Sequence, residues 1–228
     1  MEKTQLLEQI KGKLIVSCQA LEDEPLHGPH IMARMAMAAD VGGAVAIRAN
    51  GSDDISAIKH ATKLPIIGLV KRVYENSHVY ITPTKKEVDE LLDVGVDVIA
   101  LDATNRKRPN GDSLEEIIRY VKEKEQLILA DISTVEEGLH ALHLGADFIS
   151  TTLSGYTDYT VREQPGPDVE LVEKLVHATD APIFAEGRIE CPNDAKRMIQ
   201  KGAHTVVVGS AITRPQHITK VFVDGMND

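Results

Sequence analysis

The feature that most constrains this chain is a regular alternation of two kinds of segment along its 228 residues. Short apolar runs rich in Val and Ile alternate with longer amphipathic stretches, which is typical of βα units around a parallel sheet. Most runs are apolar at consecutive positions, as expected of strands that are buried on both faces. The eight predicted strands are residues 14–19, 43–49, 65–71, 96–104, 127–133, 146–153, 181–188 and 203–211.

The stretches between the predicted strands carry helix signals. In one of them, Leu114, Ile117, Ile118 and Val121 follow the i, i+3, i+4, i+7 spacing that places side chains on one face of a helix. Proline near a first helical turn is tolerated because its missing N–H would have no partner there. Such prolines are Pro192 and Pro215. The sequence also predicts three capping boxes, formed by Thr84 with Glu87, Ser113 with Glu116, and Thr134 with Glu137.

A glycine precedes every second predicted strand. These glycines are Gly42, Gly95, Gly145 and Gly202, separated by 53, 50 and 57 residues. Ordinary helix C-caps would also place glycines at such junctions. A period of two βα units repeated four times nevertheless favours a closed barrel of eight strands over an open sheet. Since such barrels run about 200 to 250 residues as one unit, we predict one (β/α)8 TIM-barrel domain over residues 1–228.

Charge and cysteine content limit the partners and the location. The chain has 25 Lys and Arg against 35 Asp and Glu, a net charge of −10. This sign disfavours binding to nucleic acid or to an anionic membrane surface. The first residues are charged and periodic and predict neither a secretion signal nor a membrane span. Cys18 and Cys191 belong to no Cys/His cluster, so we expect no disulfide, no metal site and a cytoplasmic protein.

Chemistry in such a barrel is expected where the strands end. The loops that follow the strands build the active site, so polar residues at these ends are candidates. Several of them close an apolar run abruptly, as in IIGLVK, LILAD and IFAEG. The candidates are Gln19, Arg48, Lys71, Arg72, Asp102, Thr104, Asp131, Thr151, Thr152, Glu186, Gly187, Arg188, Gly209 and Ser210.

Two segments near the C-terminus predict a phosphate site. Barrels of this type usually hold phosphate on the loops after strands seven and eight, where backbone N–H groups are free. Here these loops carry GR and VVVGSAITRP. Gly209 lets the backbone approach a ligand closely, Ser210 adds a hydroxyl and Arg214 a charge. A plain tight turn before a surface helix is the alternative, but the position favours a phosphorylated substrate and a barrel of the phosphate-binding type.

The ionisable candidates leave several roles open. Lys71 could transfer protons, act as a Schiff-base nucleophile or anchor an anion, and it could also simply emerge at the surface. Glu186 and Asp131 could act as acid and base groups or could orient Lys71 and Arg48, and a structural ion pair is the alternative. Arg48 is better suited to clamping an oxyanion or a phosphate than to proton transfer, because guanidinium keeps its proton.

Seven longer segments, spread over essentially the whole chain, are together more specific than any single motif. They are LIVSCQALEDEPLHGPHIMARMAMAADVGGAVAIRANG, PIIGLVKR, ALDATNRKRPNG, LADIST, DFISTTLSGYT, FAEGRI and VVVGSAITRP. In these segments the chain resembles the N-acetylmannosamine-6-phosphate 2-epimerase family.

The resemblance implies interconversion of N-acetylmannosamine 6-phosphate and N-acetylglucosamine 6-phosphate, a step in sialic acid and amino sugar catabolism. It implies that Lys71 transfers the proton at C2 with Glu186 as acid/base partner. By the same carry-over Arg48, Asp131 and Gln19 would bind the sugar. The phosphate would be held by Gly187, Gly209, Ser210 and Arg214. The family also suggests a homodimer and a reaction that needs neither a cofactor nor a metal.

Two other functions remain open at this stage. A Schiff-base lyase of the aldolase kind would use Lys71 as nucleophile, although the barrel aldolases it would resemble usually carry that lysine on strand six. The predicted sixth strand, ADFISTTL, has none. A non-catalytic sugar-phosphate sensor is the second alternative. The charge of −10 and the full set of polar strand ends weaken this alternative.

Overall fold

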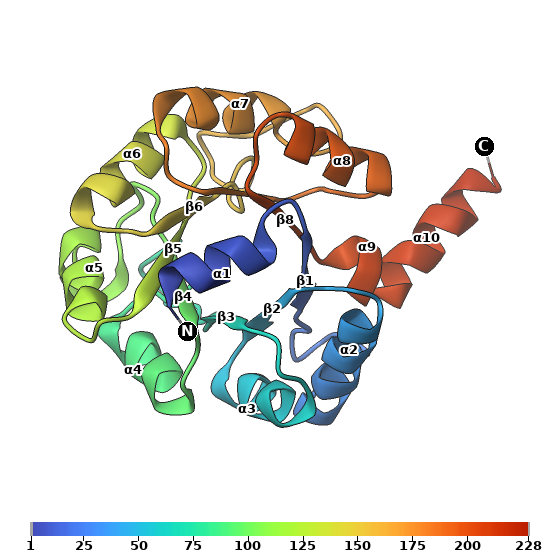
Figure 1. Cartoon of the computed structure of the whole chain (residues 1–228), viewed down its shortest axis with the longest axis horizontal. Coiled ribbons are helices and arrows are strands. Elements are labelled where there is room, and N and C mark those ends of the chain that lie inside the picture. The colour runs from blue at the N-terminus through green and yellow to red at the C-terminus, as the bar shows by residue number, and fades with distance from the viewer. Residues whose placement is uncertain (1, 228) are drawn as a thin grey trace.

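A computed structural model describes residues 2–227 of the chain, and in it eight parallel strands close into a barrel (Figure 1). Each strand pairs with the next along the chain, and β8 pairs with β1 to close the ring. The strands are β1 (Leu14–Cys18), β2 (Ala46–Asn50), β3 (Ile66–Leu69), β4 (Val98–Asp102), β5 (Leu127–Asp131), β6 (Phe148–Ser150), β7 (Ile183–Glu186) and β8 (Thr205–Val208). Each overlaps one predicted run, and the predicted TIM barrel is confirmed.

Helices surround this barrel on its outside (Figure 1). One helix precedes β1, seven follow β1 to β7 in turn, and two follow β8. They are α1 (Lys3–Ile10), α2 (Pro29–Val41), α3 (Ser52–Ala61), α4 (Lys85–Val94), α5 (Leu114–Lys122), α6 (Val135–Leu144), α7 (Val169–Ala178), α8 (Pro192–Gln200), α9 (Ser210–Thr213) and α10 (Pro215–Gly225), with a 3₁₀ turn η1 (Pro109–Gly111). Within residues 2–227 no helix has the length and apolar content to cross a membrane.

Helix α1 covers one mouth of the barrel (Figure 1). Its side chains Leu6 and Ile10 are fully buried and pack in the same apolar cluster as Ile15, Phe148 and Phe184 from the strands. This cluster fills the barrel interior, while a larger one fills the space between the strands and the outer helices. A substrate can therefore approach only from the carboxyl ends of the strands.

The predicted helix ends are largely those observed. All three predicted capping boxes form, at the starts of α4, α5 and α6. Gly95, Gly145 and Gly202 take the left-handed conformation at the ends of their helices, with φ of 72°, 113° and 97°. At the end of α2 the left-handed residue is Gly43 and not the predicted Gly42, because only Gly43 has a positive φ. The stop signal is thus the Gly–Gly pair as a unit.

Candidate active site

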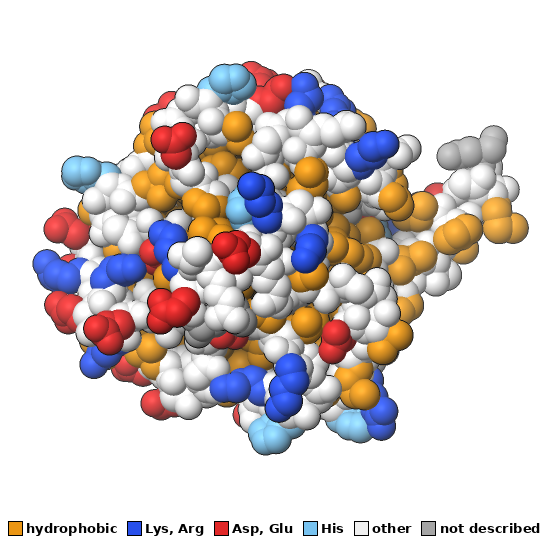
Figure 2. All heavy atoms as spheres, viewed as in Figure 1, with side chains coloured by type: hydrophobic (Ala, Val, Ile, Leu, Met, Phe, Trp, Pro, Cys, Tyr) orange, Lys and Arg blue, Asp and Glu red, His pale blue; other side chains and the backbone are white. Residues whose placement is uncertain are grey.

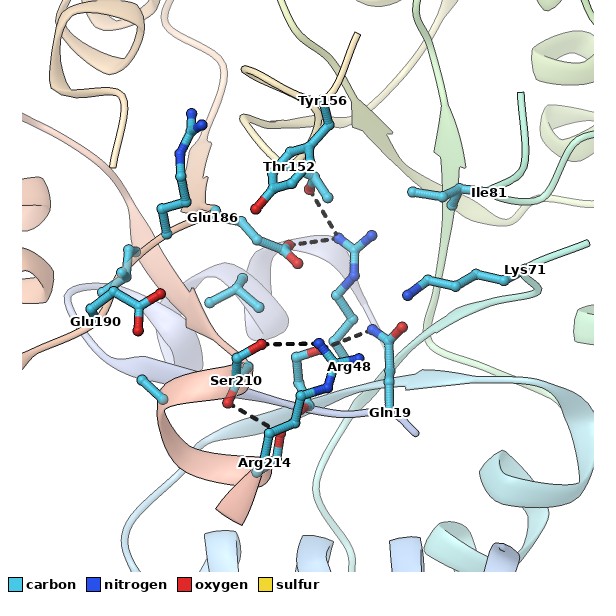
Figure 3. A pocket seen from close by; sticks show the side chains of 18 of the residues that line it. Gln19, Arg48, Lys71, Ile81, Thr152, Tyr156, Glu186, Glu190, Ser210 and Arg214 are labelled. Atoms are coloured by element: carbon cyan, nitrogen blue, oxygen red, sulfur yellow. Dashed lines mark hydrogen bonds and ion pairs between the residues drawn. The ribbon is translucent and has the colours of Figure 1, made fainter. Parts of the chain in front are cut away.

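The carboxyl ends of the strands open into a polar cavity of about 260 Å³ (Figure 3). Eight of the nine site residues carried over from the family resemblance line it, although they come from both halves of the chain. They are Gln19, Arg48, Lys71, Glu186, Gly187, Gly209, Ser210 and Arg214. The fold therefore brings the predicted residues together in one place.

Arg48 from β2 lies at the floor of this cavity and is 1% exposed. Its guanidinium donates to both oxygens of Asp131, over 3.0 and 2.6 Å, and to Glu186 Oε2 over 2.8 Å. Burial alone would favour the neutral form, but the charges of Asp131 and Glu186 outweigh it and raise the pKa of Arg48. The floor thus carries a permanent positive charge between two carboxylates.

Asp131, the ninth predicted residue, does not line the cavity. It is completely buried at the end of β5, behind Arg48. Besides the two hydrogen bonds from Arg48, it accepts one from the Thr152 hydroxyl over 2.7 Å. We therefore revise its predicted direct contact with a ligand, since in this conformation Asp131 holds Arg48 in place.

Lys71 follows β3 and points into the cavity (Figure 3). Its backbone N–H donates to the side chain of Asn50 over 2.7 Å, and its backbone pairs with Ile81 where the loop turns back. Burial, together with the positive charges of Arg48 and Arg214, lowers the pKa of Lys71 to about 8. A neutral amine that accepts a proton is consequently available near physiological pH.

Glu186 ends β7 and enters the cavity from the side opposite Lys71 (Figure 3). Its backbone is fixed by the Thr151 hydroxyl, which lies 3.1 Å from the Glu186 nitrogen and 3.0 Å from its carbonyl oxygen. Burial raises the pKa of Glu186, the charge of Asp131 adds to this effect, and Arg48 opposes it. The carboxyl group is thus suited to carrying a proton.

The residues predicted to bind phosphate line the same cavity, on the loops after β7 and β8. Gly187 has a φ of 102°, which a side chain would disfavour, and a Cβ on Gly209 would lie 3.4 Å from Ser17 Cβ. Arg214 donates to the Ser210 hydroxyl over 3.0 Å and to Glu24 over 2.9 Å. The contact of Glu24 with Arg214 is not evident from the sequence, because nothing in the run EDE distinguishes one acidic residue from the next.

Gln19 contributes an oriented amide to the same cavity. Its Nε2 donates to the Ser17 hydroxyl over 2.8 Å. Its Oε1 is buried and has no hydrogen-bond partner among residues 2–227. A buried acceptor of this kind favours a ligand that brings a donor, such as a sugar hydroxyl or an amide N–H.

Some candidates turn away from the cavity, and some lining residues were missed. Arg72 pairs with Glu87 and Glu90, while Asp102 pairs with Arg106 over 2.6 Å. Tyr80 and Ile81 line the cavity because the segment after β3 folds back onto Lys71. Hydrophobic periodicity predicts helices and strands, but it does not reveal that this loop pairs with itself at Lys71 and Ile81. Tyr156 and Glu190 also line the cavity and were missed.

The arrangement can transfer protons at two faces of one bound molecule. A base with a lowered pKa lies on one side, a carboxyl group with a raised pKa lies on the other, and a guanidinium lies between them. Such a guanidinium can stabilise an oxyanion that develops during the reaction. The basic side chains Lys71 and Arg214 also suit an anionic ligand.

Comparison with known proteins identifies the family. Residues 32–228 match the family described as "Putative N-acetylmannosamine-6-phosphate epimerase". A Clostridioides difficile (strain 630) protein named "Putative N-acetylmannosamine-6-phosphate 2-epimerase" is 58% identical over 96% of this chain and 97% of its own length. A protein with the same name from Clostridium perfringens (strain SM101 / Type A) is 56% identical over 96% of this chain and 99% of its own length.

Solved structures agree with this assignment. A structure reported as the N-acetylmannosamine-6-phosphate 2-epimerase from Clostridium perfringens has a TM-score of 0.95 and 54% identity, covering 98% of this chain and 97% of its own. Thiamine phosphate pyrophosphorylase from Pyrococcus furiosus has a TM-score of 0.62 at 20% identity, with 94% and 93% covered. This second similarity is one of fold alone.

Proposed function

Because the chain belongs to the N-acetylmannosamine-6-phosphate epimerase family, we propose that it interconverts N-acetylmannosamine 6-phosphate and N-acetylglucosamine 6-phosphate. It is an isomerase, and the reaction serves amino sugar metabolism. The observation that carries the mechanism is the placement of Lys71 and Glu186 on opposite sides of one cavity, with Arg48 between them (Figure 3).

The chemistry requires proton transfer at carbon. The two sugars differ only in configuration at C2, so a proton must leave one face of that carbon and another must reach the opposite face. The C2 proton is acidic only when C1 is an aldehyde, so the reaction needs the open-chain form. An enolate oxygen then develops at C1, and it must be stabilised.

The roles of the ionisable groups follow from this requirement. Lys71 would remove or return the C2 proton on one face, because a base works best with a pKa near the working pH. Glu186 would serve the other face in its protonated or ionised form. Arg48 would stabilise the enolate oxygen, and Asp131 would hold Arg48 in position.

The remaining residues would bind the substrate. Gly187, Gly209, Ser210 and Arg214 would hold the phosphate at one end of the cavity, with phosphate competing with Glu24 for Arg214. The unpartnered oxygen of Gln19 would accept a hydrogen bond from the sugar or its N-acetyl group. Acid/base transfer with an oxyanion clamp completes the reaction, so this route requires no redox cofactor and no metal.

We also propose that the protein is a homodimer joined through α10. This helix buries none of its own residues and projects away from the barrel, with apolar side chains along it (Figures 1 and 2). The adjacent barrel surface has an apolar groove of about 450 Å³. Its lining includes Leu14, Ala195, Ile199, Val206, Val208 and Ile212. Reciprocal docking of α10 into the groove of a second copy would cover both surfaces.

A cytoplasmic location is part of the same proposal. Cys18 is buried and Cys191 is exposed, and both are unpaired. Free thiols of this kind are typical of proteins that work in a reducing compartment.

The reaction itself can be followed by proton NMR in D2O. Wild-type protein with N-acetylmannosamine 6-phosphate should form N-acetylglucosamine 6-phosphate that carries deuterium at C2. Lys71→Ala should lower the rate by about 100- to 10,000-fold, the usual contribution of acid/base catalysis, while the protein stays folded. Product that keeps the original C2 proton throughout, or an active Lys71→Ala variant, would contradict the mechanism. Absence of conversion by the wild type would contradict the function.

A further inference from the structure

Two hydroxyl groups near the end of β6 connect the two carboxylates of the site. The Ser150 and Thr152 hydroxyl oxygens lie 2.8 Å apart. Thr152 donates to Asp131 over 2.7 Å, and Ser150 lies 3.3 Å from Glu186 Oε2. Ser150 is fully buried, whereas Thr152 lies at the edge of the cavity beside Arg48 (Figure 3). The two hydroxyl groups therefore lie in a row between the carboxylates of Asp131 and Glu186.

The direction of these hydrogen bonds follows from the number of protons available. A hydroxyl donates once. Thr152 lies within hydrogen-bond reach of Glu186 as well, but its short bond of 2.7 Å is to Asp131, so we assign its proton to Asp131. Thr152 must then accept the hydrogen bond that it shares with Ser150, so the Ser150 proton points to Thr152 rather than to Glu186. Asp131 consequently receives three donors, two from Arg48 and one from Thr152, whereas Arg48 is the remaining donor to Glu186 Oε2.

The unequal number of hydrogen-bond donors to Asp131 and Glu186 matters because of the charges around these two carboxylates. Asp131 and Glu186 face one permanent positive charge, that of Arg48, with Lys71 across the cavity and the Tyr80 hydroxyl near Asp131. One fully buried carboxylate and one that is 13% exposed, both beside a single guanidinium, favour keeping a proton on the pair. The carboxylate with more donors is the better stabilised anion, so the proton resides on the other one. The donor count places it on Glu186.

Resting on the proposed function, we propose that Ser150 and Thr152 are positioning residues that keep the exchangeable proton on Glu186 and not on Asp131. Arg48 and Ser150 both lie against Oε2 of Glu186, so Oε1 is the oxygen that bears the proton. Glu186 gives this proton to C2 and becomes a carboxylate, and the substrate enolate becomes the product aldehyde. The Ser150 hydroxyl can then turn from Thr152 toward Oε2 and stabilise the new anion.

Variants that remove one hydroxyl at a time test this proposal. Thr152→Val keeps the volume of the side chain but removes the donor to Asp131, which then competes for the proton. We expect conversion of the two sugar phosphates to fall about tenfold or more, within the range of acid/base effects. Thr152→Ser should restore the rate to within about threefold, because it retains the hydroxyl. Thr205→Val is the control, since Thr205 is more deeply buried than Thr152 and its hydroxyl bonds Lys13 O at the other end of the barrel.

Isotope exchange separates loss of the Glu186 proton from a general structural defect. In D2O, Lys71 can still remove the C2 proton of one of the two sugars and return a deuteron to the same face. In Thr152→Val, deuterium should therefore enter that unconverted sugar at nearly the wild-type rate while its conversion is slow. A structural defect would lower exchange and conversion in parallel for both sugars.

The outcomes are distinguishable from a failure of the proposed function. If wild-type protein converts neither sugar, the function itself is wrong. If the wild type is active, three results would overturn the positioning role. These are a Thr152→Val variant with normal conversion, parallel loss of exchange and conversion for both sugars, and a Thr152→Ser variant that is not restored.

Discussion

At the scale of single residues, the site concentrates charge where burial makes it unfavourable. Arg48 is buried with two carboxylates, and Lys71 is held as a base by the same environment that lowers its pKa. Functional sites commonly sacrifice stability in this way, because a group fully solvated by water would have an ordinary pKa. The effect of burying Arg48 and that of burying Lys71 on stability can each be measured as a change in the free energy of unfolding.

Replacing Lys71 by Met should stabilise the protein at neutral pH. The folded-state pKa of about 8 lies below the ordinary value of 10.5, so the unfolded chain binds more protons between these values. The protonated lysine therefore destabilises the folded protein fully below pH 8 and not at all above about pH 10.5. The pKa difference of 10.5 − 8 = 2.5 corresponds to about 3 kcal/mol of this destabilisation. Urea unfolding should show Lys71→Met more stable than wild type at pH 7, with the gap closing toward pH 10. A gap independent of pH would show that the lysine is not desolvated.

Replacing Arg48 by Met should have the opposite effect on stability. Asp131 and Glu186 would be left buried without their cation, which costs about 3 to 5 kcal/mol. Burial already raises the pKa of Glu186 and Arg48 opposes this rise, so removing Arg48 would raise that pKa further and the loss should be greater at pH 8 than at pH 5. Lys174→Met, which breaks an exposed ion pair with Glu170, should leave the free energy of unfolding almost unchanged. Equal effects of both substitutions in thermal or urea unfolding would refute this assignment.

The sequence predicted most of the residues in the cavity but not the contacts among them. Position in the barrel is enough to find Lys71 and Glu186, since each ends an apolar run. It does not reveal that Asp131 lies behind Arg48, because both belong to the last residues of buried strands and the difference arises from side-chain directions. Glu24 was missed for a similar reason, since its partner Arg214 is 190 residues away.

At the scale of helices and strands, the three predicted capping boxes differ in importance. Glu116 on α5 is partly exposed, and among residues 2–227 its carboxylate accepts hydrogen bonds only within its own box, from Ser113. Glu137 on α6 is fully buried and also accepts the backbone N–H of Asn105 and the hydroxyl of Tyr159. It therefore joins three loops at the rim of the barrel. The sequence shows the box but not the loops that gather around it.

This difference predicts unequal effects of one substitution. Glu116→Ala should lower the free energy of unfolding only slightly, because water can replace its carboxylate at the helix start. Glu137→Ala leaves several buried donors without a partner and should cost about 3 kcal/mol or more. Urea unfolding of the two variants measures the difference directly. Similar losses would mean that Glu137 acts only as a cap.

At the scale of the whole molecule, the alternating pattern and the glycine period were sufficient for the barrel. Strands buried on both faces have few alternatives once eight of them are connected by helices. The last βα unit departs from this pattern, because α10, the second helix after β8, projects away from the barrel surface (Figure 1). Helix α10 has the apolar positions of a packed helix, so its sequence does not distinguish packing on its own barrel from packing on a partner.

The proposed homodimer therefore depends on side chains that one copy leaves exposed. Phe222 and Met226 on α10 are 68% and 84% exposed, and burying two such side chains contributes a few kcal/mol per helix, about 1.5 to 3 for each side chain. Phe222→Glu would place a charge in the apolar groove and should convert the dimer to a monomer in sedimentation equilibrium. Lys220→Gln on the same helix, at an exposed position that pairs with Asp224, should leave the dimer intact. A wild-type monomer, or a dimer that survives Phe222→Glu, would show that α10 does not join two copies.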